Sequence, residues 1–273
     1  MTGKKQAGRR METTVRIEAP VEAVWKALTD AEELSRWFPL QARVRPGADG
    51  SVWLSWGPPW EGESRITLWD PPRRLRTGWQ FTHAADAAGA AEVGVDYILE
   101  GEGGRTTLRL VHSGFGEGKD WDDEFDAVRR GWRYELRSLR HYLERHRGTP
   151  RRVVWERVPL PVPVGEAHAR LMGPGGLLRE GSLAGLKEGD PYAFTTATGD
   201  PFRGTVLVNE APDFAGTVEN WKDGLFRLHL EDCTGVREAG LWLATWGVPE
   251  ADLEGLRTRF RSILEALFPK ERV

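Results

Sequence analysis

Several side chains of this 273-residue chain have the types and spacing expected of a binding or catalytic site. His112 follows Leu108 and Leu110 at steps of two, so it shares the apolar face of a predicted strand. An imidazole there would serve as an acid or base, or as a polar anchor for a bound molecule. The alternative is a core histidine that a loop carbonyl satisfies.

Large aromatic residues are predicted to share the interior with His112. They either form a wall for a planar or apolar ligand, or they are simply the core of the fold. The candidate ligand-binding set is Trp56, Trp79, Tyr97, His112, Phe115 and Trp132.

Other candidate sites have structural explanations. The acidic run 120–126 would begin a helix, where carboxylates stabilise the helix dipole, so a metal cluster is not expected there. Gly101-Glu-Gly-Gly joins two predicted strands, which favours a hairpin over a phosphate loop. Cys233 is the only cysteine, lies in a predicted turn and has no evident histidine partner. We expect no bound metal, no cofactor and no nucleophilic catalysis by Cys233.

The composition excludes several classes of protein. The chain has 38 Lys and Arg against 41 Asp and Glu, a net charge of −3, which argues against a nucleic-acid partner or an anionic membrane surface. No uncharged apolar run approaches the ~18 residues that a membrane span needs. The basic start of the chain is not followed by the apolar stretch of a secretory signal. These features predict a soluble, cytoplasmic protein without a membrane span.

The elements that would position these side chains can be predicted from periodicity. A strand at 13–19 precedes a helix that begins near Pro20, and a second short helix follows at 31–37. From 41 to 114 apolar residues recur every second position between Pro- and Gly-rich turns, which predicts antiparallel strands. On two of these, Asp96 and Arg109 fall on the opposite face and predict a surface ion pair. Residues 119–146 carry one apolar stripe at three- and four-residue steps and predict one long helix.

The second half of the chain follows the same plan. It reads as a strand at 153–160, a helix at 164–172, strands at 192–196, 202–208, 214–219, 225–231 and 236–245, and a helix at 250–268. The segments that end at Gly114 and Gly247 align at an offset of 133 residues, and the opening strands at Val15 and Val153 align at 138. We therefore predict two copies of one strand–helix–sheet–helix unit. The predicted boundaries are a disordered basic tail at 1–11, domains at 12–147 and 152–273, and a linker at 148–151.

The first copy resembles a known family. The residues that carry the resemblance are Ala-Pro-Val-Glu-Ala-Val-Trp-Lys-Ala-Leu-Thr-Asp at 19–30, Leu-Ser-Arg-Trp-Phe at 34–38, Thr-Leu-Arg-Leu-Val-His-Ser-Gly-Phe at 107–115, and Gly131-Trp132. They are similar to the START-like (SRPBCC) superfamily, in the branch of the activator of heat shock protein 90 ATPase homologues. The resemblance implies an α+β helix-grip fold, in which a curved antiparallel sheet wraps a long C-terminal helix and leaves an apolar cavity. The second copy departs from it, because Thr245 stands at the position of His112 and the Gly-Trp pair is missing.

These expectations lead to two functional hypotheses. In the first, the protein is not an enzyme, and its cavity binds a small apolar molecule or an exposed apolar peptide, as a ligand carrier or a stress- or chaperone-related protein. The alternative is a polyketide cyclase or hydratase-type lyase, in which His112 would be the catalytic residue. A true co-chaperone is a weaker third hypothesis, because the eukaryotic activators have a separate domain before this fold.

Overall fold

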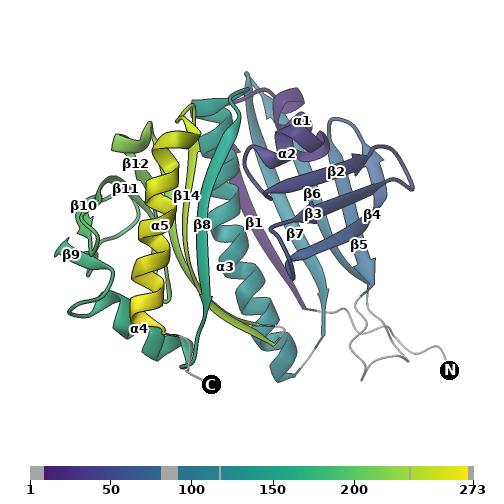
Figure 1. Ribbon diagram of the computed structural model, residues 1–273. Coiled ribbons are helices and arrows are strands. Elements are labelled where there is room, and N and C mark those ends of the chain that lie inside the picture. The colour runs from purple at the N-terminus through teal and green to yellow at the C-terminus, as the bar shows by residue number, and fades with distance from the viewer. Residues whose placement is uncertain (1–8, 81–91, 117, 234, 270–273) are drawn as a thin grey trace. The chain divides into compact units, whose positions relative to one another are not determined.

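The computed structural model describes residues 9–80, 92–116, 118–233 and 235–269 (Figure 1). The chain divides into two compact units. The first comprises Met1–Phe125 and Glu135–Gly148, and the second comprises Asp126–Tyr134 and Thr149–Val273. Each unit contains one seven-stranded antiparallel sheet and helices, so the fold class is α+β, as predicted.

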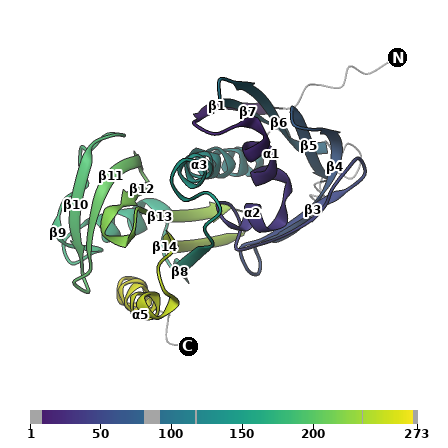
Figure 2. The same ribbon diagram turned by 90° about the horizontal axis from the view of Figure 1, so that it is seen from above.

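The sheet of the first unit has the strand order β1-β7-β6-β5-β4-β3-β2. In Figure 2 it curves from β1 round to β3, with α1 and α2 on its concave side. Its elements are β1 (Arg9–Ile17), α1 (Val21–Thr29), α2 (Ala31–Ser35), β2 (Gln41–Arg45), β3 (Ser51–Ser55), β4 (Glu61–Asp70), β5 (Arg74–Gln80), β6 (Glu92–Glu102) and β7 (Arg105–Phe115).

The first unit begins earlier than the sequence predicts. β1 starts at Arg9, within the segment expected to be a disordered tail, and residues 1–8 lie outside the described part of the chain. The extra residues belong to the strand because Arg9 and Arg10 continue the pairing with β7, opposite Phe115 and Ser113. The predicted hairpin at 101–104 is confirmed, since β6 and β7 pair through Glu102 and Arg105.

The helix α3 (Lys119–His141) follows β7 and continues into a π-helical turn, Tyr142–His146, so the predicted long helix is confirmed. Its C-terminal part is tied to the first unit by two hydrogen bonds. The hydroxyl of Ser138 donates to the carbonyl oxygen of Trp37 at 2.8 Å, and that of Tyr142 donates to the Glu33 carboxylate at 2.6 Å. Both acceptors lie in or just after α2, so these bonds fix the end of α3 against that helix.

The second unit has the strand order β8-β14-β13-β12-β11-β10-β9. The helix α5 lies along β8, and apolar residues from both faces of that contact are fully buried. The elements are β8 (Arg151–Pro159), α4 (Val164–Met172), β9 (Leu178–Gly181), β10 (Pro191–Thr196), β11 (Pro201–Glu210), β12 (Asp213–Val218), a 3₁₀ turn (Glu219–Trp221), β13 (Gly224–Cys233), β14 (Val236–Trp246) and α5 (Glu250–Leu267).

The two sheets have the same topology. In each, the first strand pairs with the last, and the remaining strands follow in reverse order of sequence. Gly114 and Gly247, which the sequence comparison aligned, both have a left-handed backbone, with φ of 100° and 70°. A side chain would be strained at either position. The predicted tandem of two helix-grip copies is therefore confirmed at the level of the fold.

One predicted contact is wrong. Asp96 does not pair with Arg109, because the strand register places Asp96 opposite Val111 and Arg109 opposite Ile98. Instead the Asp96 carboxylate is buried and accepts hydrogen bonds from Arg74, at 2.7 Å, and from Arg76. Arg109 pairs with Glu12 on β1 at 2.6 Å.

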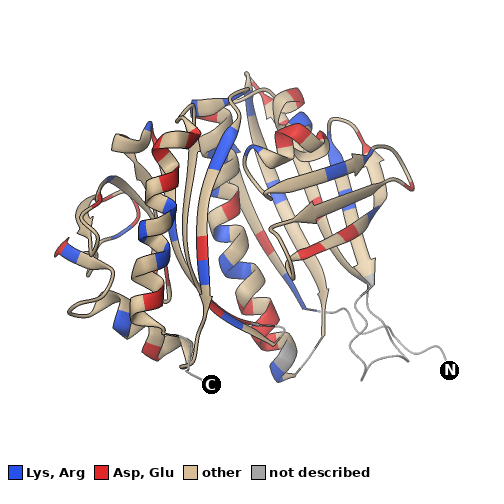
Figure 3. Cartoon of the chain, viewed as in Figure 1, with Lys and Arg blue, Asp and Glu red and all other residues tan. Residues whose placement is uncertain are grey.

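Acidic and basic side chains are interspersed along the strands and helices of each unit (Figure 3). Within the described residues, we find no helix with the length and apolar character needed to cross a membrane.

Candidate functional site

The candidate site lies on the inward face of the central strands of the first sheet. Directly paired residues share a face, and His112 on β7 is opposite Val95 on β6, which is opposite Thr77 on β5. Alternation along the strands then places Tyr97 and Trp79 on this same face. The alternating apolar pattern in the sequence predicted this arrangement.

His112 is enclosed by aromatic rings. Its imidazole lies 5.4 Å from the ring of Trp79, edge to face, and 4.7 Å from the ring of Phe115. His112 and Phe115 are buried, whereas Trp79 is partly exposed. Burial lowers the pKa of His112 from 6.5 to about 3, so the imidazole is neutral at pH 7.

This aromatic group extends onto the first turns of α3. The ring of Phe115 meets Phe125 at 5.1 Å and Trp121 at 6.3 Å, both edge to face. The guanidinium of Arg9 lies 4.0 Å above the Phe125 ring and pairs with Asp122 at 2.5 Å. Trp121 and Phe125 belong to the apolar stripe of the predicted long helix, but they are not among the predicted site residues. Arg9 was missed because it was assigned to the tail.

Tyr97 lies one row further along the sheet. It is 8% exposed, and its paired neighbours are Leu75 and Leu110. Burial raises the pKa of its phenol, so the hydroxyl stays protonated at all physiological pH values. Tyr97 is therefore a neutral polar group within an apolar face.

Trp56 contributes to a second aromatic cluster. Its ring meets Phe38 at 5.0 Å, and Phe38 stacks on Trp37 at 4.8 Å. The indole nitrogen of Trp37 donates to the carbonyl oxygen of Ala27 at 2.8 Å, which holds this cluster against α1.

Trp132 is buried, as predicted for the middle of the helix stripe. It lies in Asp126–Tyr134, the part of α3 that groups with the second unit. The structure therefore does not assign Trp132 to the group around His112.

The side chain of Cys233, which was not expected to act as a nucleophile, lies outside the part of the chain that the structure describes.

The second copy has a different interior. Thr245, at the position of His112, is buried, and its hydroxyl donates to the carbonyl oxygen of Arg152 at 3.3 Å. Phenylalanine rings pack on one another from the sheet to α5: Phe226 lies 5.0 Å from Phe202 and 6.1 Å from Phe260. All three are fully buried. The interior of this copy is thus a ring-packed core without a titratable group at the position of His112.

Comparison with known proteins agrees with the fold of the first copy. Residues 18–144 match the model of the family described as Activator of Hsp90 ATPase homolog 1-like protein. Residues 18–144 therefore have an AHSA1-like fold. This family belongs to the START-like superfamily that the sequence motifs indicated. The topology of the second unit makes the chain a tandem of two such folds, of which the second is diverged.

Solved structures resemble about half or nearly all of the chain. CalU16 from Micromonospora echinospora is 27% identical, with a TM-score of 0.40, over 50% of this chain and 76% of that one. The Aha1 dimer from Colwellia psychrerythraea is 18% identical, with a TM-score of 0.45, over 51% of this chain and 99% of that one. The di-domain ARO/CYC BexL from the BE-7585A biosynthetic pathway is 14% identical, with a TM-score of 0.43, over 97% of this chain and 100% of that one. No curated protein matches the chain.

Proposed function

We propose that the AHSA1-like domain binds a small apolar molecule, or an apolar protein segment, against the inward face of β5–β7. The observation that carries this proposal is the aromatic group of Trp79, His112 and Phe115, which continues to Phe125 on α3. Aromatic rings of this kind provide large apolar contact area with few polar groups, as in binding sites for planar ligands. Of the three rings on the strands, Trp79 is the partly exposed one, and so we expect it to meet the ligand first.

The environment of His112 favours binding over proton transfer. A general acid or base works best when its pKa is near the operating pH, and burial holds the pKa of His112 at about 3. A neutral imidazole still donates or accepts one hydrogen bond at each nitrogen. We therefore assign His112 as a polar anchor for a group on the ligand.

The second copy supports this assignment to the first. Its equivalent interior is filled by buried phenylalanine rings, and Thr245 replaces His112. We propose that the second copy has a structural role and that ligand binding belongs to the first.

The test is binding of a hydrophobic fluorescent probe, 8-anilinonaphthalene-1-sulfonate, to the full chain. We expect binding at low micromolar concentration with quenching of tryptophan emission. Trp79→Glu should weaken binding at least tenfold, because a carboxylate would have to be desolvated among the rings. The matched control is Trp53→Glu on β3, since Trp53 is also partly exposed and follows the buried, inward-facing Val52, which puts it on the opposite face of the sheet. Equal binding by wild type and Trp79→Glu would remove the proposal.

The alternative function is a polyketide cyclase or hydratase-type reaction at the same place, with His112 moving a proton. The buried phenol of Tyr97 on the same face is the observation that favours it, because it would supply a second polar group. His112→Ala distinguishes the two functions. A carrier keeps most of its probe affinity, because one polar anchor contributes only about 1 kcal/mol. An enzyme retains substrate binding and loses turnover by about 10²-fold or more.

A further inference from the structure

The end of α3 changes its winding between two histidines. α3 ends at His141, and the next five residues, Tyr142–His146, form a π-helical turn. In an α-helix of 3.6 residues per turn, side chains five residues apart point about 140° away from each other. The wider π winding, with its i→i+5 hydrogen bonds, brings such residues round to the same side.

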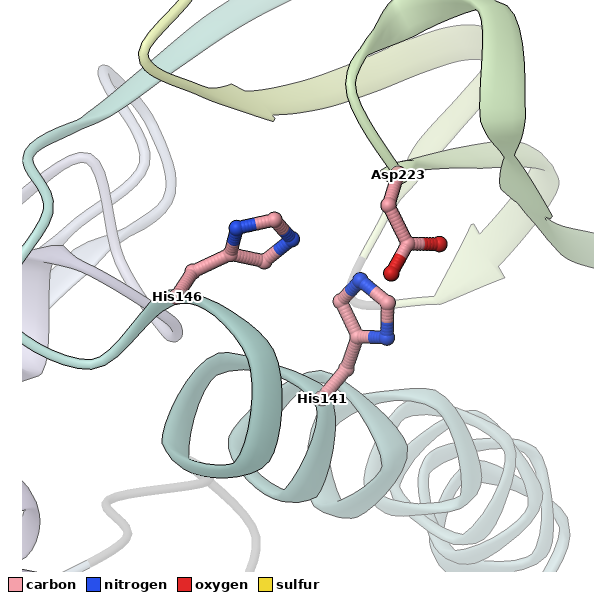
Figure 4. Close-up of side chains that lie close together, drawn as sticks. All are labelled: His141, His146 and Asp223. Atoms are coloured by element: carbon pink, nitrogen blue, oxygen red, sulfur yellow. The ribbon is translucent and has the colours of Figure 1, made fainter.

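The two imidazoles consequently lie next to each other (Figure 4). Their ring centroids are 5.0 Å apart, and one nitrogen of each ring lies within 4.8 Å of the other. His146 is partly exposed, so an ion in solution can reach the pair from its side. Asp223, also drawn in Figure 4, belongs to the second unit and is not part of this pair.

We propose that His141 and His146 bind one divalent transition-metal ion of the zinc or nickel class. Neutral imidazole is the commonest protein ligand for these ions. Two nitrogens that each lie 2.0–2.1 Å from a tetrahedral zinc are about 3.4 Å apart. The two nitrogens lie within 4.8 Å of each other, and rotation of the two side chains would bring them to that separation. Water fills the remaining coordination positions.

The position on the helix also suits a cation. The carbonyl groups at the C-terminus of a helix carry a partial negative charge, and α3 is 23 residues long. This field favours a cation, whereas the positive charges of Arg140, Arg145 and Arg147, which are next to the two histidines in the sequence, oppose one. A bound ion would stabilise the π-helical conformation of Tyr142–His146.

Isothermal titration calorimetry of the full chain without an affinity tag, with zinc chloride and separately with nickel chloride at pH 7, tests the proposal. We expect one ion per chain for the wild type, and an affinity at least about tenfold lower for His141→Gln and for His146→Gln, a change of 1.4 kcal/mol or more. The matched control is His168→Gln on α4, a partly exposed helical histidine, which should bind as the wild type does.

A second readout keeps the test independent of local folding defects. A metal that binds only the folded chain raises its melting temperature, and this increase should be absent in both variants although their far-ultraviolet circular dichroism is unchanged. No saturable binding by the wild type, wild-type affinity in both variants, or an equal loss in His168→Gln would each overturn the proposal.

Discussion

The indole of Trp79 meets the imidazole of His112 edge to face, with ring centroids 5.4 Å apart and planes inclined by 74°. The contact joins a buried ring to a partly exposed one. It places a titratable group where protonation would put a charge among aromatic side chains, and we therefore expect the domain to lose stability in acid.

The first prediction concerns that sensitivity. The pKa of His112 is about 3 in the folded chain and near 6.5 when unfolded, so the unfolded chain binds the extra proton between these values. The stabilisation is therefore complete above pH 6.5 and is lost as the pH falls towards 3. From pH 7 to pH 5 this residue should cost the wild type about 2 kcal/mol of unfolding free energy.

Urea denaturation of wild type and His112→Gln at pH 7 and pH 5 measures this loss. The other titrating groups are common to both proteins, so the difference between them isolates His112. A difference in unfolding free energy that is the same at both pH values would show that His112 is not buried in its neutral form.

The second prediction concerns the long helix. Trp132 is 7% exposed, and truncation of a buried tryptophan removes its packing and leaves a cavity. Trp132→Ala should lower the free energy of unfolding by about 3–5 kcal/mol, measured by chemical denaturation. A midpoint equal to that of the wild type would contradict the burial of this side chain.

The third prediction concerns the buried carboxylate on the outward face of the first sheet. Asp96→Asn leaves two guanidiniums, those of Arg74 and Arg76, without their charged acceptor. We expect a loss of roughly 1–3 kcal/mol in unfolding free energy. The control is Glu12→Gln, which breaks the more exposed pair with Arg109 and should cost less stability than Asp96→Asn. If the two variants lose the same stability, the burial of Asp96 has no energetic effect.

The fourth prediction separates stability from binding. Phe226→Ala in the second copy should lower the free energy of unfolding by about 3–5 kcal/mol, because its ring packs against Phe202 and Phe260. Below the unfolding transition, its affinity for the fluorescent probe should equal that of the wild type. Weaker probe binding in this variant would mean that the second copy takes part in the site.

Hydrophobic periodicity predicted most of the helices and strands, but it did not predict which residues of neighbouring strands lie opposite each other. Steps of two identified the inward faces of β5, β6 and β7, and steps of three and four identified α3. Alternation with a period of two shows which residues of a strand share one face of the sheet. It does not show which residue of the neighbouring strand lies opposite each of them, so it does not determine the register. The wrong pairing of Asp96 with Arg109 follows from this. The short strand β9 (Leu178–Gly181) was missed because four residues carry too little alternation to recognise.

Periodicity limits the prediction of the candidate sites in the same way. The residues of the Trp79–His112–Phe115 group lie on strands whose faces can be read from the sequence. His141 and His146 could not be associated, because their spacing of five matches neither the α-helical nor the strand period. Only the local change to π winding brings them together.

The pairing of β1 with β7, and of β8 with β14, has a consequence for synthesis on the ribosome. The strand made first in each copy finds its neighbour only in the strand made last, at Arg9 with Phe115 and at Arg151 with Trp246. Until then β1 has no partner strand within its own sheet, and contacts of such long sequence separation form slowly. The nascent chain therefore exposes an open strand edge for most of the time that each copy takes to be translated, and this interval is when aggregation or capture by a chaperone competes with folding.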